Sequence, residues 1–356
     1  MERTALTSPA GPAAPNDGDV SAVIVNFESG DALGDCIRSL REQPALMETI
    51  VVDNGSKDGS AAEALASFPD IVLVDPGRNL GFAGGANAGA RVARGRLLLF
   101  LNPDTELLPA AVETLAAAFD SAGVGVAGPM LELDYLGARE LGCTIDPIGY
   151  PVPLSRPRPP LYVSGCALMT TRDLFAELGG FDERFFMFVE DVDLCWRTLL
   201  RGLDVRVVPD AVVRHQGGAS AAGGYITADG LATTRFRVVL RERNTLATLL
   251  KCYALPTLAA VLPAYVLQSL ATAVALAATG RSQTALGILE GLWWNVRELP
   301  RTRALRRRAQ RARTCPDREI LQRMHHGVQK LTLLRRFGVP PVDQSEGAPR
   351  GSRLML

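Results

Sequence analysis

The chain has 356 residues, of which 47% are hydrophobic and 21% are charged, so it is long enough for a large α/β core and a smaller appendage. Its 38 basic and 38 acidic residues give a formal net charge of zero. This balance argues against general nucleic-acid binding, which requires an excess of positive charge. The six cysteines form no CxxC pair, which favours reduced thiols in the cytosol over disulfides or a zinc site.

The first 19 residues have no apolar core of signal-peptide length and are typical of a disordered lead-in. From Val20 onward, short apolar runs alternate with helical patterns. The patterns predict strands at 20–27, 47–56, 71–77 and 95–104, and helices at 31–42, 60–68 and 82–94. Strands separated by helices of about ten residues predict βαβ units and a mostly parallel sheet that is covered on both faces.

Each of these predicted strands ends in polar residues. They are Asn26, then Asp53 and Asn54, then Arg78 and Asn79, then Asn102 and Asp104. A turn would explain any one of them, since Asn-Pro and Pro-Asp are common turn dipeptides. In parallel sheets, however, ligands bind beyond the carboxyl ends of the strands. Four polar ends in succession therefore indicate a shared ligand site on one rim.

A second polar cluster, in the segment FVEDVDLCWR, contains Glu190, Asp191 and Asp193 between an aromatic run and a predicted helix. Carboxylates at a helix start are often ordinary charges that the helix dipole favours. Here the three neighbouring phenylalanines would partly desolvate them. Desolvation raises the pKa of a carboxyl group, which suits a general base.

Two further segments point to a ligand. His215 ends a predicted strand ahead of two glycines, which favours a metal or phosphate role over the more common structural one. Residues 77–87, GRNLGFAGGAN, would let the backbone approach a ligand at a helix start. This segment is not a P-loop, and no GxGxxG follows the first strand, so a nicotinamide dehydrogenase is disfavoured.

These segments together resemble a known family. In chain order they are VIVNF, VVDNGSKDGS, GRNLGFAGGANAG, LFLNPD, GGFDERFFMFVEDVDLCWR and VVRHQGGAS. This order resembles the family 2 glycosyltransferases, in particular bacterial rhamnosyltransferase-like members, over residues 20–250. The resemblance implies the GT-A nucleotide-diphospho-sugar transferase fold, an α/β fold with a mostly parallel sheet flanked by helices. NPD resembles the DxD metal motif with Asn102 in the first acidic position, which leaves Asp104 as its carboxylate.

The resemblance also implies a role for each site residue. The nucleotide sugar would contact Asn26, Asp53, Asn54, Arg78, Asn79, Asn102 and Asp104. Of these, Asp53 is suited to accept from the pyrimidine N3–H. A divalent metal, Mn2+ or Mg2+, would lie at Asp104 and His215 and bridge the diphosphate.

The catalytic roles follow from the same resemblance. Asp191 would deprotonate the acceptor hydroxyl, with Glu190 beside it, and the choice between these two carboxylates as base is left to experiment. Asp182 and Arg197 would lie near the sugar or acceptor, and Arg197 could also pair with the neighbouring carboxylates. A metal stabilises the departing diphosphate, and a single base on the opposite face allows in-line attack with inversion.

The C-terminal third carries an uncharged stretch, residues 252–280, that is long enough to span a bilayer. Two prolines disfavour one straight helix, and a single span would place the arginine-rich residues 297–313 on the outer side, against the positive-inside tendency. An in-plane or re-entrant element is therefore preferred, with Trp293, Trp294 and the arginines against anionic headgroups. A true span and a soluble or dimer-forming helix are the alternatives.

The sequence thus predicts a disordered N-terminus at 1–19, a GT-A domain at 20–250, a hydrophobic and arginine-rich helical extension at 251–338, and a disordered tail at 339–356. The expected function is inverting, metal-dependent transfer of a sugar, with dTDP-rhamnose favoured as donor. The acceptor would be a lipid-linked or cell-envelope glycan, and the protein would be peripheral or monotopic at the cytoplasmic face of the plasma membrane. The alternative is a non-catalytic nucleotide-sugar-binding scaffold of the same fold.

Overall fold

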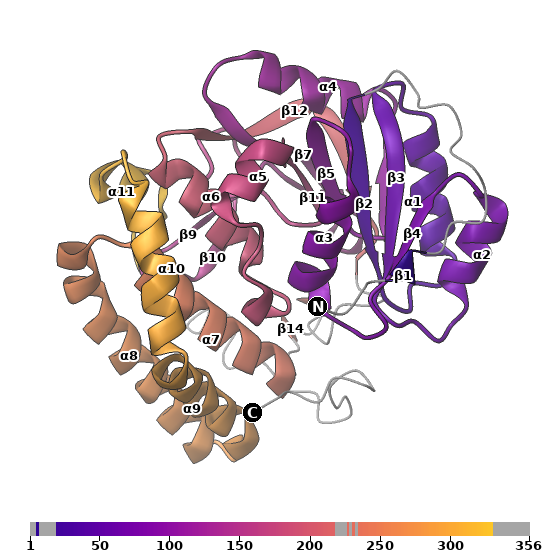
Figure 1. Cartoon of the computed structure of the whole chain (residues 1–356). Helices are drawn as coiled ribbons and strands as arrows, with labels where there is room; N and C mark the ends of the chain where they lie inside the picture. The colour runs from indigo at the N-terminus through magenta and orange to yellow at the C-terminus, as the bar shows by residue number, and fades with distance from the viewer. Residues whose placement is uncertain (1–4, 7–18, 218–225, 228–229, 232–233, 330–356) are drawn as a thin grey trace.

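The computed structural model describes residues 5–6, 19–217, 226–227, 230–231 and 234–329. A ten-stranded sheet has helices against its faces, and the C-terminal helices pack beside this α/β unit (Figure 1). The strands are β1 Ala5–Leu6, β2 Val20–Asn26, β3 Leu46–Asp53, β4 Val72–Asp75, β5 Leu97–Leu101, β6 Thr105–Leu107, β7 Val124–Leu133, β8 Ala138–Glu140, β9 Cys143–Ile145, β10 Pro151–Pro153, β11 Ala167–Thr171, β12 Asp204–His215, β13 Ile226–Thr227 and β14 Gly230–Leu231. The α-helices are α1 Ala32–Arg41, α2 Ser60–Ser67, α3 Gly81–Val92, α4 Ala111–Ala117, α5 Arg172–Leu178, α6 Glu190–Leu200, α7 Arg235–Cys252, α8 Leu255–Ala278, α9 Ser282–Arg297, α10 Leu299–Arg311 and α11 Asp317–Arg323.

The sheet confirms the predicted βαβ pattern and extends it. Its order is β1-β4-β3-β2-β5-β11-β7-β12-β6, with β8 paired to β7. The predicted strands β2, β3, β4 and β5 pair in parallel. β11 then lies between β5 and β7, antiparallel to both, which no pattern in the sequence predicted. β12 pairs with β6, and this register places His215 opposite Thr105.

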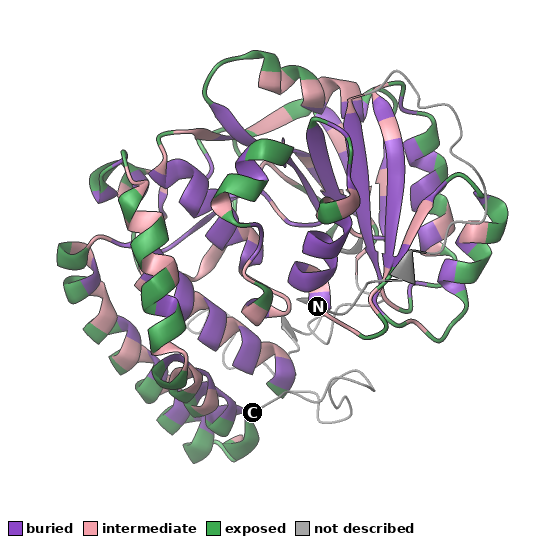
Figure 2. Ribbon diagram, viewed as in Figure 1, coloured by how far each residue is buried: buried purple, intermediate pink, exposed green. Residues whose placement is uncertain are grey.

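Helices cover both faces of the sheet, which explains why its strands are nearly continuously apolar. Successive residues of a strand point to opposite faces. In β2, Val23 and Val25 enter one core with residues of α3, α6 and α7, whereas Ala22 and Ile24 enter a second core with residues of α1 and α4. Figure 2 shows the central strands almost entirely buried. The two-faced burial confirms the prediction from strand composition.

The glycine-rich segment packs α3 closely against the sheet. A Cβ at Gly89 would lie 2.4 Å from the Cγ1 atom of Val23, and a Cβ at Gly85 would lie 2.7 Å from the Cγ1 atom of Val25. Such distances are shorter than van der Waals contact, so larger residues would push the helix away from β2. These glycines therefore serve helix–sheet packing.

The C-terminal helices share a core with the α/β unit. Leu246 and Leu249 of α7 and Tyr265 of α8 belong to the same buried cluster as Trp196 of α6. The predicted disordered N-terminus lies outside the described residues except at Ala5–Leu6, which pair with β4, and at residue 19. The predicted tail at 339–356 lies entirely outside them.

Helix α8 exposes apolar residues and buries polar ones. It is long and apolar enough to cross a membrane by length and composition, and only 17% of its apolar window is buried inside the protein. Its Ser269 hydroxyl is buried and hydrogen-bonds the carboxylate of Glu242, and its Tyr265 hydroxyl donates to the carbonyl of Glu242 at 3.0 Å. Its outward residues Leu267 and Val274 are 70% and 69% exposed. Figure 2 shows that much of α8 is exposed, and its exposed large side chains are apolar.

Candidate active site

The carboxyl ends of β2 and β3 carry a polar cluster around the buried Asn26. The Nδ2 atom of Asn26 lies 3.4 Å from Oδ1 of Asp53, and it donates to the hydroxyls of Ser56 at 3.1 Å and Ser60 at 3.0 Å. Asp53 Oδ1 also accepts from the backbone N–H of Ser56 at 3.1 Å. Because the side-chain amide of Asn26 donates hydrogen bonds to neighbouring side chains, Asn26 orients this cluster. The half-buried Asp53 is the better candidate for direct contact with a nucleotide.

Two more of the predicted nucleotide-binding residues, Asn54 and Asn79, hold the start of α3. Asn54 Nδ2 donates to the carbonyl of Gly81 at 2.9 Å, and Asn79 Oδ1 accepts from the N–H of Gly81 at 2.8 Å. Gly81 has φ +69°, and a Cβ there would lie 2.2 Å from the carbonyl oxygen of Phe186, so glycine is required. Arg78 is exposed on the loop ahead of α3. Asn54 and Asn79 therefore shape the loop that presents Arg78.

The NPD segment and the end of β12 meet at the same rim. Asp104 is buried, and its Oδ1 atom lies 3.3 Å from Nε2 of His215. The backbone joins the two segments as well, because the N–H of Gln216 donates to the carbonyl of Asp104 at 3.0 Å. The carbonyl of Asn102 accepts from the hydroxyl of Thr105 at 2.7 Å, which fixes the turn. The structure thus brings together Asp104 and His215, the predicted metal ligands.

The chemistry of this pair fits a divalent cation. A carboxylate and an imidazole are both ligands for Mn2+, and a carboxylate is preferred by Mg2+. Across the described ranges, no group of three or more His, Cys, Asp or Glu side chains gathers to hold a metal. With two protein ligands, Asp104 and His215, the rest of the coordination shell would be phosphate oxygens and water, as is common for Mg2+ at phosphate sites.

Helix α6 begins at the two predicted catalytic carboxylates, which have different surroundings. Asp191 is half-buried, and its Oδ2 accepts from the N–H of Gly165 at 3.0 Å while its Oδ1 accepts from the N–H of Val192 at 2.8 Å. Glu190 is buried, and its Oε2 has no hydrogen-bond partner in the described part of the chain. Asp191 is therefore the better stabilised anion.

The pKa values of this pair follow from these surroundings. Burial raises the pKa of Glu190, and the adjacent charge of Asp191 raises it further. Burial also raises the pKa of Asp191, but the hydrogen bond from Gly165 and the charge of Arg241 oppose that rise. Hydrogen bonds to a carboxylate favour its ionised form. Of the two carboxyl groups, Asp191 is therefore the one whose ionised form its surroundings favour more.

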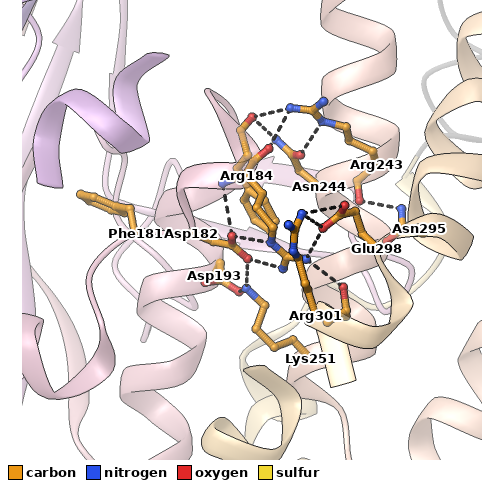
Figure 3. A network of polar contacts seen from close by, with 12 residues as sticks. Phe181, Asp182, Arg184, Asp193, Arg243, Asn244, Lys251, Asn295, Glu298 and Arg301 are labelled. Carbon is orange, nitrogen blue, oxygen red and sulfur yellow. Dashed lines mark hydrogen bonds and ion pairs between the residues drawn. The ribbon is translucent and has the colours of Figure 1, made fainter. Parts of the chain in front are cut away.

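Asp182 and Arg197 lie in a buried ionic network, partly shown in Figure 3, and their expected place near the sugar or acceptor stays a prediction. Asp182 accepts from Arg184 Nε at 2.9 Å and from Lys251 Nζ at 2.7 Å. Arg197 pairs with Asp193 at 2.7 Å, as expected for its neighbouring carboxylates. Burial alone would raise the pKa of Asp182, but Lys251 and Arg184 lower it well below its usual range. Both charges are neutralised by protein partners.

Glu140 is a titratable group near the site that the sequence did not reveal. It lies on β8, opposite Leu131 of β7, and its Oε1 is buried without a hydrogen-bond partner among the described residues. Burial raises the pKa of Glu140 to about 7, a hydrogen bond with Cys143 opposes this rise, and the charge of Asp191 adds to it. Only the pairing of β7 with β8 brings Glu140 within electrostatic reach of Asp191, so no local pattern marks it.

A family model matches the part of the chain that carries the predicted nucleotide-binding residues. Residues 21–142 match the model described as glycosyl transferase family 2. This range carries every predicted nucleotide-binding residue from Asn26 to Asp104. The fold and the polar rim are those of a glycosyltransferase, and the match of residues 21–142 together with the relatives below supports a family 2 glycosyltransferase.

Individual relatives extend the match beyond that range. The N-acetylglucosaminyl-diphospho-decaprenol L-rhamnosyltransferase of Mycobacterium tuberculosis is 29% identical over 232 residues, covering 54% of this chain and 74% of the relative. The low-salt glycan biosynthesis hexosyltransferase Agl10 of Haloferax volcanii is 26% identical over 200 residues, covering 52% of this chain and 64% of the relative. Both names are those of glycosyltransferases, and the first agrees with the predicted rhamnosyltransferase-like branch.

A solved structure supports the fold. The crystal structure of GalNAc-T7 with UDP, GalNAc and Mn2+ matches with a TM-score of 0.53 at 15% sequence identity. The match covers 65% of this chain and 47% of that chain. At this identity the likeness concerns the fold alone, and it confirms the predicted GT-A architecture.

Proposed function

We propose that the protein is an inverting, metal-dependent glycosyltransferase that moves a sugar from a nucleotide-sugar donor to a lipid-linked or cell-envelope glycan acceptor. The observation that carries this proposal is the pairing of Asp104 with His215 at 3.3 Å, on the same strand-end rim as Asp53. A bound divalent metal would supply positive charge to the departing diphosphate. The exposed Arg78 is suited to contact a phosphate of the same donor.

Asp191 is the proposed base. As the acceptor oxygen forms its bond to the anomeric carbon, its hydroxyl proton passes to the carboxylate of Asp191. The bond between the anomeric carbon and the diphosphate oxygen breaks, and its electron pair leaves with the nucleoside diphosphate. A single displacement of this kind inverts the anomeric centre, as in inverting glycosidases. Glu190 lies beside Asp191, and burial and the charge of Asp191 raise its pKa, which makes it the less suited of the two as the base.

Rhamnose is the favoured sugar, with dTDP-rhamnose as its donor. The support is the resemblance of the motifs to rhamnosyltransferase-like members and the name of the Mycobacterium tuberculosis relative, an L-rhamnosyltransferase. The same name describes an acceptor in which N-acetylglucosamine is linked through a diphosphate to decaprenol. A polyprenyl-diphospho-sugar is therefore the first acceptor to test.

A lipid acceptor requires access to a membrane, and the apolar face of α8 and α9 is suited to provide it. Eight of the nine large hydrophobic side chains exposed in the described residues lie on these two helices. They are Leu255, Leu267, Leu270, Val274, Leu286, Leu289, Trp293 and Val296. We assign this face to the lipid interface at the cytoplasmic side, where nucleotide sugars are available, with the helices lying in its plane.

The two tryptophans of α9 differ in exposure and in their neighbours. Trp293 is 61% exposed and stays a candidate for headgroup contact. Trp294 is half-buried, with the guanidinium of Arg243 5.0 Å and that of Arg184 5.6 Å from its ring centroid. Trp294 therefore belongs to the ionic network and not to the lipid face.

Thermal stability of the full chain with and without donor tests the proposed function. A ligand that binds only the folded protein adds about 2.7 kcal/mol of stability at a concentration of 100 times its dissociation constant. We expect dTDP-rhamnose to raise the melting temperature only with Mn2+ or Mg2+, and we expect UDP- and GDP-sugars to act more weakly. Asp104→Ala should abolish the metal-dependent shift, and Glu106→Ala, which removes a neighbouring half-buried carboxylate, should keep it.

Two outcomes would contradict the proposal. Absence of any donor- and metal-dependent shift, with anionic vesicles present as well as absent, would remove the proposed donor site. Donor binding without transfer of sugar to polyprenyl-diphospho-N-acetylglucosamine or to other polyprenyl-diphosphate glycans would instead favour the non-catalytic scaffold.

A further inference from the structure

The loop immediately before the catalytic carboxylates has a strained backbone. Phe186, Phe188 and Val189 have φ values of 64°, 69° and 72°, in the left-handed region that non-glycine residues rarely adopt. Phe186, with ψ −64°, is the centre of a tight γ-turn in which the N–H of Met187 donates to the carbonyl of Phe185 at 2.7 Å. Such conformations persist only where the surrounding structure holds them, and they cluster at functional sites.

Helix α7 holds this loop through one buried amide (Figure 3). The Nδ2 atom of Asn244 donates to the carbonyls of Phe185 at 3.0 Å, Met187 at 2.9 Å and Phe188 at 2.8 Å. Arg243 fixes the orientation of that amide, since its Nε donates to Asn244 Oδ1 at 3.2 Å. Its Nη2 also donates to the carbonyl of Phe185 at 3.2 Å. The two N–H groups of one asparagine side chain are therefore shared among three carbonyls of the strained loop.

The side chains of the loop are held by neighbouring elements as well. The ring of Phe186 packs edge-to-face on Phe236 with centroids 6.0 Å apart, and Arg237 lies 4.9 Å from the ring centroid of Phe188. Both partners belong to α7. From the opposite side, the N–H of Ala83 near the start of α3 donates to the carbonyl of Phe186 at 3.0 Å. The loop is thus held between the glycine-rich start of α3 and one face of α7.

We propose that Asn244 is a positioning residue for the reaction: it holds the left-handed loop that sets Glu190 and Asp191 at the start of α6. This inference rests on the proposed function, because it takes Asp191 as the base. Asn244 reaches three backbone carbonyls and is fully buried, so it acts through the loop and not by touching substrate. A consequence is that catalysis depends on α7, which lies far beyond residues 21–142 of the family match.

The test compares Asn244→Ala with Thr248→Ala in the full chain. Thr248 lies one turn further along α7, is equally buried, and has no hydrogen-bond partner for its hydroxyl among the described residues. Small displacements of catalytic groups cost up to roughly 10²-fold in rate. We therefore expect N244A to lower kcat by about one to two orders of magnitude. The dissociation constant for dTDP-rhamnose with Mn2+ should stay within about twofold, because the donor residues lie outside the loop.

Further readouts separate positioning from general loss of structure. Hydrogen exchange of backbone amides in residues 183–192 should rise in N244A and not in T248A. Asn244→Gln, which retains the amide, should recover part of kcat.

An N244A enzyme with wild-type kcat, or equal losses in N244A and T248A, would overturn the proposal. If N244A does not fold, Asn244→Ser is used in its place, because serine keeps one hydrogen-bond donor. Its kcat and its dissociation constant for the donor are then compared with those of the wild type in the same way. A wild-type chain that transfers no sugar would refute the proposed function instead.

Discussion

The ammonium of Lys251 on α7 lies 2.8 Å from Oδ1 of Asp193, which stands two residues beyond the proposed base on α6. The same ammonium lies 2.7 Å from Oδ2 of Asp182, and all three side chains are at least 94% buried. A single cation thus joins the loop before α6, the helix α6 itself and the C-terminal helices (Figure 3).

Replacing Lys251 with methionine should be strongly destabilising, because it leaves two buried carboxylates with one cation fewer. Removing one partner of a buried ion pair costs about 3–5 kcal/mol. We expect a value near the lower end, since Asp182 keeps Arg184 and Asp193 keeps Arg197. Urea unfolding of the variant measures this loss. Arg38→Met removes an exposed ion pair with Asp35 and should cost less than about 1 kcal/mol. Equal effects of the two changes would contradict the importance of the buried network.

Glu190→Gln should increase stability at neutral pH. The folded-state pKa of Glu190 is raised above its ordinary value of 4.5 by burial and by Asp191. A carboxyl with a raised pKa stabilises the fold fully below the unfolded pKa, and this contribution is lost as pH rises through the folded pKa. Glutamine does not ionise and so avoids that loss. The melting temperatures of the wild type and of Glu190→Gln should therefore converge below pH 4.5 and separate as pH rises. A constant difference at all pH values would contradict the raised pKa.

The apolar face of α8 should carry membrane binding. We expect the wild-type chain to float with vesicles of phosphatidylcholine and phosphatidylglycerol. Burial of a leucine or valine side chain contributes roughly 1.5–3 kcal/mol, so Leu267→Asp with Val274→Asp should weaken partition by more than about tenfold. Leu136→Asp, at an exposed leucine away from α8 and α9, should bind as wild type. Unchanged flotation of the double variant would remove the lipid assignment of this face.

Local patterns predicted the parallel part of the sheet and the proximity of its polar strand ends. The apolar runs of β2 and β5 and the helical pattern of α3 are short-range signals, and the structure confirms them. The pairing of Asp104 with His215 also appears in the structure at 3.3 Å, while their role as metal ligands stays a prediction. The rim was predictable because parallel strands bring their carboxyl ends together.

The contacts from α7 were not predictable in the same way. Asp182 and Lys251 are 69 positions apart, and nothing in the local sequence of either marks the other as its partner. The sequence therefore predicted only that Asp182 lies near the sugar or acceptor, whereas the structure pairs it with Lys251 and Arg184. Asn244 was hidden for the same reason, since its three acceptors are backbone carbonyls that any residue carries.

The most direct test of the central claim is kcat for sugar transfer by Asp191→Asn beside Glu190→Gln, with donor binding measured on both. General-base catalysis contributes about 10²–10⁴-fold, so D191N should lose activity in that range while it still binds the nucleotide sugar. E190Q should keep most of its activity, because burial and the charge of Asp191 raise the pKa of Glu190 and disfavour the carboxylate form that a base needs. Wild-type kcat in D191N, or a large loss confined to E190Q, would contradict the assignment of Asp191 as the base.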